Sequence, residues 1–349
     1  MSEDISQDQL VDRLAERLLS LCACDTTSGS EDAMIPTLSQ ILRADGAELE
    51  TLVVEPGRTN VLATWGRPRV VFTTHLDTVP PYIAPRRVGR RVFGRGTCDA
   101  KGQIVAQLEA LRRLRSEGLD GMAWLGLIGE ETDAKGAAAL PIWKSQLADC
   151  RLVVGGEPTQ GRCATGQRGY LHLRVSTHGR AAHSGTPERG QSAIWPLLHW
   201  LDRLRRDPVR VDEDLGPEVW NLGQIEGGEA ANVIPDHASA HLLCRTLPNS
   251  DFLGRVQDAA PGDAKVEILV NEPATRYPRL AGFDYAAMTF GSDLPAFAAT
   301  LPDADLVLLG PGSIDVAHTP DEFIDLDDLV AGADSLCQLG RLALVERSS

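Results

Sequence analysis

The sequence lacks any apolar run that approaches the roughly 20 residues needed for a membrane-spanning helix. Its first segment, Met1–Gln9, is polar and acidic. It therefore also lacks the basic and then apolar layout of a secretory signal. We expect a cytoplasmic protein with no membrane partner.

Positive charge is also in short supply. The 349 residues contain 34 Lys and Arg against 49 Asp and Glu, which gives a formal net charge of -15. Nucleic-acid phosphates and anionic lipids repel so acidic a chain. We therefore expect no nucleic acid among its partners.

Cysteine is present but forms no recognisable framework. The seven cysteines are scattered, and the C-x-C pair Cys22 and Cys24 has no second pair at the spacing of a zinc site. An odd, dispersed set of this kind is typical of buried, reduced thiols.

What the chain does contain is a mixture of short apolar strands and amphipathic helices. A chain this long suits one large and one smaller domain. Such a mixture indicates an α/β fold whose sheet is covered on both faces. We expect helices over Ser6–Cys24 and Lys101–Glu117. The expected strands are Thr51–Val54, Asn60–Trp65, Arg69–Thr74, Ala123–Ile128, Leu152–Gly155 and Asp305–Leu309.

The middle of the chain follows a different order, strand–helix–strand–strand–helix–strand, which is typical of ferredoxin-like α+β domains. These elements are predicted at Tyr170–Ser176, Ser192–Arg206, Trp220–Ile225, His237–Arg245, Phe252–Ala259 and Lys265–Val270. The pattern predicts an inserted domain over 169–272 within a larger domain formed by 1–168 and 273–349.

Histidine and carboxylate side chains recur where predicted elements begin or end. Each alone has an ordinary explanation: a strand-end histidine is usually structural, Asp99 could cap the following helix, and a Glu pair is usually exposed. Adjacent anions at the end of a buried strand, however, cost free energy unless cations compensate them. The set comprises His75, Asp77, Asp99, Glu130, Glu131, Glu157 and His318.

Imidazole and carboxylate ligands without thiolates suit zinc, with cobalt or manganese as substitutes. Two metals about 3.5–4 Å apart can polarise a carbonyl and activate a water. A free glutamate beside them can take up the proton of that water and return it to a leaving nitrogen. The set therefore indicates a two-metal hydrolase.

The ordered segments H-L-D, G-R-G-x-x-D-x-K-G, E-E, E-P-T and A-H-T-P-D-E resemble a family of di-zinc deacylases. That family includes aminoacylase, acetylornithine deacetylase, acetylcitrulline deacetylase, succinyl-diaminopimelate desuccinylase and a glutamate-releasing carboxypeptidase. The resemblance covers nearly the whole chain. One departure is Gly129, since many relatives have Asp before the glutamate pair.

The resemblance implies a role for each of these side chains. One zinc would be held by His75, Asp99 and Glu157, and the other by Asp99, Glu131 and His318, with Asp99 bridging. Glu130 would be the general base and acid, and Asp77 would orient His75.

The inserted domain would serve as a lid and dimerisation domain. His183 would reach the active site of a partner subunit and stabilise the developing oxyanion. Asn232 and Arg245 would lie near a substrate carboxylate, and Gly291 and Ser292 loosely match a substrate-contacting loop. Without the resemblance, His183 would be a surface histidine and Arg245 an exposed strand residue.

The resemblance therefore implies a homodimeric zinc enzyme that deacylates a small N-acyl, especially N-acetyl, amino acid, closest in pattern to acetylornithine or acetylcitrulline deacetylase. A dipeptidase or aminopeptidase on the same scaffold is the alternative. Relatives that grip a free amine tend to have Asp where this chain has Glu157, which favours the deacylase. A non-catalytic binding protein is disfavoured, because all five ligands and Glu130 are present.

Overall fold

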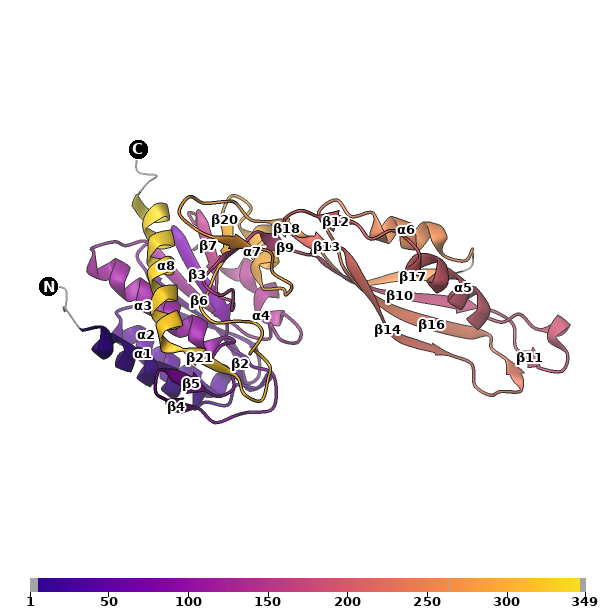
Figure 1. The fold of residues 1–349 in the computed structure, drawn as a ribbon, viewed down its shortest axis with the longest axis horizontal. Helices are drawn as coiled ribbons and strands as arrows, with labels where there is room; N and C mark the ends of the chain where they lie inside the picture. Colours follow the sequence, from indigo (N-terminus) through magenta and orange to yellow (C-terminus); the bar gives the residue numbers. More distant parts are fainter. Residues whose placement is uncertain (1–5, 263, 346–349) are drawn as a thin grey trace. The chain divides into compact units, whose positions relative to one another are not determined.

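The computed structural model describes residues 6–262 and 264–345, and these form two compact units (Figure 1). The first unit contains the chain up to Thr165, Tyr277–Ala286 and the chain from Ser292 onward. The second contains Gly166–Arg276 and Ala287–Gly291. The units thus divide three to four residues away from the boundaries expected at 168/169 and 272/273.

The first unit is built on a six-stranded mixed sheet in the order β1-β2-β6-β3-β7-β20. β1, β2 and β6 pair antiparallel, whereas β6, β3, β7 and β20 run parallel to one another. The mixed α/β sheet predicted from the sequence is confirmed. The strands span Glu48–Glu55 (β1), Arg58–Trp65 (β2), Val70–His75 (β3), Met122–Leu127 (β6), Leu152–Gly155 (β7) and Asp305–Leu308 (β20).

Helices cover this sheet because its central strands are apolar on both faces. Every residue of β3, β6 and β7 is buried. Three long helices, α1 (Gln7–Cys22), α3 (Lys101–Ser116) and α8 (Leu326–Val345), pack against one another, and the latter two also contact β3. Ser6 and Gln9 form a capping box at the start of α1.

Shorter elements complete the first unit. α7 contacts β7, β20 and α4. A small sheet has the strand order β21-β5-β4, and β8 pairs with β19. These elements span Ile35–Ala44 (α2), Lys135–Ala138 (α4), Leu294–Thr300 (α7), Arg86–Val88 (β4), Arg91–Phe93 (β5), Cys163–Ala164 (β8), Tyr285–Ala286 (β19) and Phe323–Asp325 (β21).

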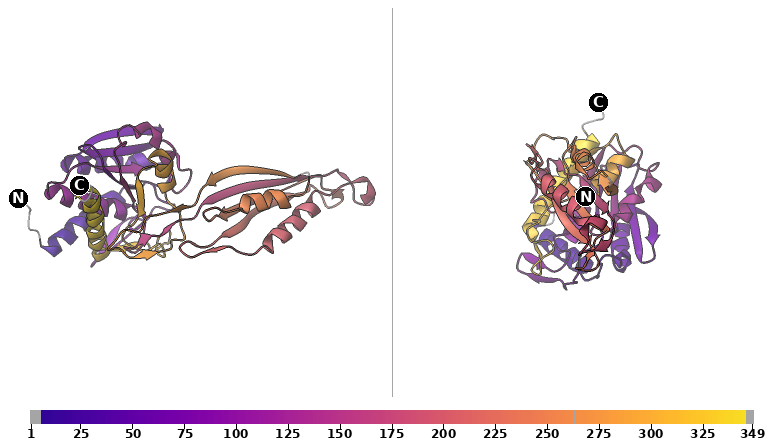
Figure 2. Two further views of the ribbon diagram at one scale, coloured as in Figure 1. Left: turned by 90° about the horizontal axis from the view of Figure 1, so that it is seen from above. Right: turned by 90° about the vertical axis from the view of Figure 1, so that its right-hand side faces the viewer.

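The second unit is an antiparallel sheet with two helices on one face (Figures 1 and 2). Its strand order, β14-β16-β10-β17, and its chain order confirm the predicted ferredoxin-like topology. Alternate apolar residues of β10 and β16 pack against the helices and form a separate core. The elements span Tyr170–His178 (β10), Ile194–Arg205 (α5), Val219–Gly227 (β14), His237–Arg245 (β16), Phe252–Ala259 (α6) and Lys265–Glu272 (β17).

Three two-stranded pairs lie at the margins of the second unit. They are β11 (Ala182–His183) with β15 (Val233–Ile234), β12 (Val211–Asp212) with β13 (Gly216–Pro217), and β9 (Gly166–Gln167) with β18 (Thr275–Arg276).

All seven cysteines are free thiols, and all except Cys24 are buried, as the sequence predicted. Among the helices of residues 6–262 and 264–345, none combines the length and the apolar character needed to cross a membrane.

Candidate metal centre

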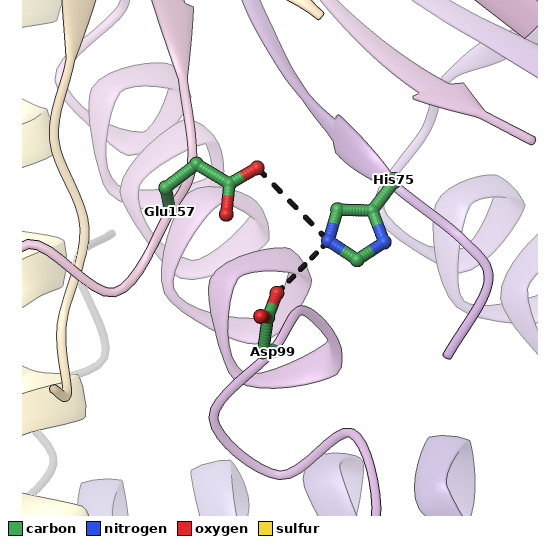
Figure 3. Close-up of side chains that lie close together, drawn as sticks. All are labelled: His75, Asp99 and Glu157. Carbon is green, nitrogen blue, oxygen red and sulfur yellow. Dashed lines mark hydrogen bonds and ion pairs between the residues drawn. The ribbon is translucent and has the colours of Figure 1, made fainter. Parts of the chain in front are cut away.

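The first group of candidate ligands gathers around His75, the last residue of β3 (Figure 3). Its Nδ1 lies 2.9 Å from the main-chain oxygen of Asp77, to which a protonated Nδ1 donates. Nε2 then faces two carboxylates, with Asp99 Oδ1 at 2.9 Å and Glu157 Oε1 at 4.0 Å. All three side chains are buried. A histidine held through one nitrogen while the other faces carboxylates is arranged as metal-binding histidines are.

A second group shares Asp99. His318 Nε2 lies 3.3 Å from Asp99 Oδ2 and 2.8 Å from Glu131 Oε1. The two oxygens of Asp99 therefore face different histidines, which is the arrangement of a bridging carboxylate. A third grouping joins His75 with Glu130 and Glu131, and the ligand atoms within each grouping lie within 4.8 Å of one another.

The fold explains why these groups meet. β3, β6 and β7 are parallel neighbours, so their carboxyl ends lie at one edge of the sheet, where α/β folds place ligands. His75 ends β3, the Glu130–Glu131 pair follows β6, and Glu157 follows β7. The structure thus brings together all five predicted ligands and Glu130.

The carboxylates of this centre lie close together and are largely buried, so their negative charges repel one another. Burial and the charge of Asp99 raise the pKa of Glu157 well above its ordinary value. Burial alone would raise the pKa of Asp99, but its contacts with His318 and His75 lower it instead. The hydrogen bonds to Asp99 and Glu131 raise the pKa of His318 to about 10. The close approach of these carboxylates therefore favours a bound cation.

The donor set therefore fits a pair of metal ions. The five predicted ligands are two imidazoles and three carboxylates with no thiolate, which suits zinc and its neighbours.

Asp77 contacts His75, as expected, and also contacts the loop that follows β6. Its carboxylate Oδ1 is 3.5 Å from His75 Nδ1, so the main-chain oxygen of Asp77 is the closer partner of that ring. The carboxylate instead accepts three main-chain N–H groups, from Gly129, Glu130 and Glu131, at 3.0–3.2 Å. Asp77 thus holds the strand-end loop as well as the histidine.

Asp99 is not the cap of the following helix. The N-cap of α3 is Ala100, without a side-chain hydrogen bond, because the Asp99 carboxylate faces the two histidines. Glu322 fixes this segment by accepting the N–H groups of Cys98 and Asp99 at 3.0 and 3.2 Å. Glu322 is fully buried and pairs with Arg95 at 2.6 Å.

Arg95 and Glu322 were not among the residues predicted from the sequence. They lie within the motifs G-R-G-x-x-D-x-K-G and A-H-T-P-D-E, which is the sequence feature that points to them.

Two predicted residues of the second unit, His183 and Asn232, lie together and exposed. The Ser184 N–H donates to the Asn232 main-chain oxygen at 2.9 Å beside the β11–β15 pair. Arg245 lies at the far end of β16, eight residues beyond His237, or roughly 27 Å along a strand. The length of the strand therefore separates Arg245 from Asn232 within one chain, and their expected place near a substrate carboxylate stays a prediction.

Gly291 and Ser292 fall on either side of a unit boundary. Gly291 lies beside Gln167 and Arg245 in the second unit. The Ser292 hydroxyl accepts the Leu294 N–H at 3.3 Å, at the start of α7 in the first unit.

Comparison with known proteins identifies the family. A peptidase M20 domain-containing protein of Schizosaccharomyces pombe is 32% identical over 92% of this chain and 82% of that protein. The chain belongs to the peptidase M20 family. Residues 165–260 of this M20 protein match the peptidase dimerisation domain. It is therefore a metallohydrolase with an inserted dimerisation domain.

Other relatives of this M20 protein carry peptidase names. A probable carboxypeptidase of Paracoccidioides brasiliensis is 31% identical over 92% of this chain and 83% of its own. A tripeptidase of Staphylococcus aureus has the same fold, with a TM-score of 0.79 at 20% identity over 96% of this chain and 98% of that one.

Proposed function

We propose that this protein is a zinc-dependent exopeptidase that hydrolyses the last amide bond of short peptides and releases an amino acid with a free α-carboxylate. The observation that carries the hydrolytic chemistry is Asp99, shared between two ligand groups with Glu130 beside them. The names of the curated relatives, probable carboxypeptidases, favour a peptide over the acetylated amino acid expected from the sequence.

Glu130 is the residue of this chain that moves the proton. Bound metal ions would supply Lewis-acid polarisation of the scissile carbonyl and make the attacking water more acidic. Neither histidine of the centre forms an ion pair with Glu130 among the residues that the structure covers. Burial, reinforced by nearby carboxylates and only partly offset by His75, raises the pKa of Glu130 well above its ordinary value. Glu130 can thus accept a proton from water and donate it to the departing amine.

Two arginines of the second unit offer a site for the substrate carboxylate. Arg168 donates to the main-chain oxygens of Pro217 and Thr289, and Arg245 lies over the ring of Tyr170. In the part of the chain described, neither guanidinium forms an ion pair with a carboxylate. Burial and then the charge of Arg245 lower the pKa of Arg168, so an anion would relieve a repulsion. A guanidinium fork suits a carboxylate bidentately.

Deacylation of N-acyl amino acids is the second candidate, and Glu157 is the observation that favours it over an aminopeptidase. A carboxypeptidase and an N-acyl-amino-acid deacylase release the same kind of product, a free amino acid, and differ only in the acyl side. An aminopeptidase must instead bind a free amine.

A substrate panel separates these activities. Zinc-loaded protein is incubated with dipeptides, tripeptides, N-blocked dipeptides, C-terminally amidated peptides and N-acetyl amino acids, and the released amine is quantified. We expect cleavage of peptides with a free carboxylate, N-blocked or not, and none of the amidated peptides. Cleavage of the amidated peptides but not of the peptides with a free carboxylate would contradict the proposal.

Metal removal supplies the control for this panel. Chelation should abolish turnover, and zinc or cobalt should restore it. Full activity in protein confirmed to be metal-free would exclude the metallohydrolase mechanism.

A further inference from the structure

We propose that Arg58 is a positioning residue that fixes the loop Gly129–Ala134 and thereby aims the side chains of Glu130 and Glu131. The catalytic consequence of this inference rests on the proposed function, but the placement of the loop does not. Arg58 belongs to none of the candidate ligand groups, and it begins β2, more than 70 residues before the loop.

The guanidinium of Arg58 is nearly buried and binds three carboxylates. Nε donates to both oxygens of Glu31, at 3.1 and 3.3 Å. Nη1 and Nη2 donate to the two oxygens of Asp133, at 2.8 and 3.1 Å, and Nη1 also donates to Glu55 at 3.0 Å. The bidentate pair with Asp133 sets both the distance and the orientation of the loop, which a point charge could not do.

Gly129 shows that this pair shapes the backbone of the loop. Its φ is +77°, a conformation that favours glycine. A Cβ atom at this position would lie 2.4 Å from Arg58 Nη2 and 2.5 Å from Asp133 Oδ1. The Arg58–Asp133 pair therefore occupies the space that a side chain at this position would need.

Hydrogen bonds to the main-chain oxygen of Gly129 and to the carboxylate of Asp77 also hold the loop. The main-chain N–H groups of Thr132, Asp133 and Ala134 all donate to the Gly129 oxygen. The Asp77 carboxylate accepts the N–H groups of residues 129–131. Glu130 and Glu131 thus sit between two fixed points, Asp77 on one stretch of backbone and Arg58 on the other.

Asp77 and Arg58 are both linked to the segment Ser28–Glu31. The Ser28 hydroxyl donates to Asp77 at 2.7 Å, and the Gly29 N–H donates to Glu31, the buried partner of Arg58, at 3.0 Å. A continuous network therefore runs from Asp77 through Ser28–Glu31 and Arg58 to Asp133. Removal of Arg58 would open it and leave the Glu31 carboxylate buried without its cation.

Hydrogen–deuterium exchange of the metal-free protein tests this role without any assumption about substrate. The variants are Arg58→Lys and Asp133→Asn, which are milder than Arg58→Ala. The matched control is Arg13→Lys, because Arg13 also binds a fully buried glutamate, Glu109, at 3.0 Å. We expect exchange within Gly129–Ala134 to accelerate by about tenfold in both test variants, with little change elsewhere. The Arg13 control should leave this loop as in wild type.

The outcomes are distinct. Unchanged exchange of the loop in both test variants would overturn the inference, and so would an acceleration spread evenly over the first unit. Should Arg58→Lys fail to fold, Asp133→Asn decides alone, since it removes the loop contact while keeping Arg58 and Glu31.

A second measurement connects the loop to metal binding. Cobalt titration followed by absorption should show weaker binding to the group that contains Glu131, by about 10–100-fold as for other outer partners of metal ligands. Turnover measured in parallel should show a lower kcat, with a smaller relative change in KM. A wild-type protein that binds metal but cleaves no peptide would refute the proposed function and leave the exchange result on Arg58 standing.

Discussion

At the scale of single residues, the centre depends on carboxylates with different environments. Asp99 and Glu131 contact His318, and Glu157 lies beside His75, whereas Glu130 is not paired with either ring. Carboxylate side chains of the same kind therefore acquire different roles from their neighbours. Because of this difference, substitutions can distinguish the metal ligands from the general base.

Replacement of Glu130 by Gln should abolish turnover while leaving the metal content nearly intact. Loss of a general acid–base group costs about 10²–10⁴-fold in rate. Glu131→Gln is the matched control, because its carboxylate contacts His318 and its loss should release metal. Metal analysis beside kinetics distinguishes the two. Near-wild-type activity of the Glu130 variant would exclude it as the base, and loss of a metal would make it a ligand.

Asp133→Asn should lower stability in a pH-dependent way. The hydrogen bonds from Arg58 lower the pKa of Asp133 from 3.8 to about 2 in the folded protein. A depressed carboxyl pKa contributes stability that is fully present above the unfolded value and is lost as pH falls through the folded value. Urea unfolding of the metal-free protein should therefore show a difference from wild type at pH 7 that shrinks between pH 3.8 and about 2. A constant difference over that window would contradict the ion-pair origin.

At the scale of elements, the sheet of the second unit has two outer strands, β14 and β17. The main-chain groups on the outer side of β14 have no neighbouring strand in the described chain. A shallow cleft between β14 and α5 is lined mainly by apolar side chains, among them Leu198, Trp220, Leu222 and Ile225. Ile225 is 47% exposed and Trp195 on α5 is 62% exposed. Such an edge suits pairing with a second copy of the chain.

Ile225→Glu should therefore weaken the proposed homodimer. A charge placed among apolar side chains at an interface core costs affinity, and we expect the dimer dissociation constant to rise at least about tenfold. Ile142→Glu is the control, since Ile142 is 60% exposed but belongs to the first unit. Analytical ultracentrifugation at several protein concentrations measures the dimer dissociation constant of each variant. Equal dissociation constants for the two variants would exclude the β14 edge as the interface.

At the scale of the whole molecule, the expected dimer would matter because the second unit carries His183 and Asn232 at one end and Arg245 at the other. One strand length separates them, so the two ends cannot contact the same small ligand from one chain. The expectation that His183 serves the active site of a partner subunit remains a prediction.

Mixing two inactive variants tests it. Heterodimers of Glu130→Gln with His183→Ala would contain one site in which both side chains are intact, so activity should return to a fraction of wild type. Each variant alone should be low, His183→Ala by about 10²–10³-fold for the loss of an oxyanion donor. If subunit exchange is demonstrated and the mixture stays inactive, His183 does not act in trans.

The sequence alone determined the elements and the ligand types. Hydrophobic periodicity is a local signal, so α3, β6, β16 and α6 were predicted within about two residues of their observed bounds. The ligands were predictable because side chains at the ends of parallel strands meet at one sheet edge. The sequence therefore suffices to place His75, Glu131 and Glu157 in one candidate set of ligands.

Only the tertiary structure decided which groups support that centre. Arg58 and Asp133 are 75 residues apart, and Arg95 and Glu322 are 227 apart. No periodicity or spacing pairs such residues, because their contacts arise from the packing of separate segments. The same holds for Asp77, whose carboxylate binds main-chain N–H groups of a loop 52 residues later and not chiefly the histidine two residues before it. Main-chain donors are present at every position, so sequence cannot single them out, and only the folded chain selects which of them a carboxylate meets.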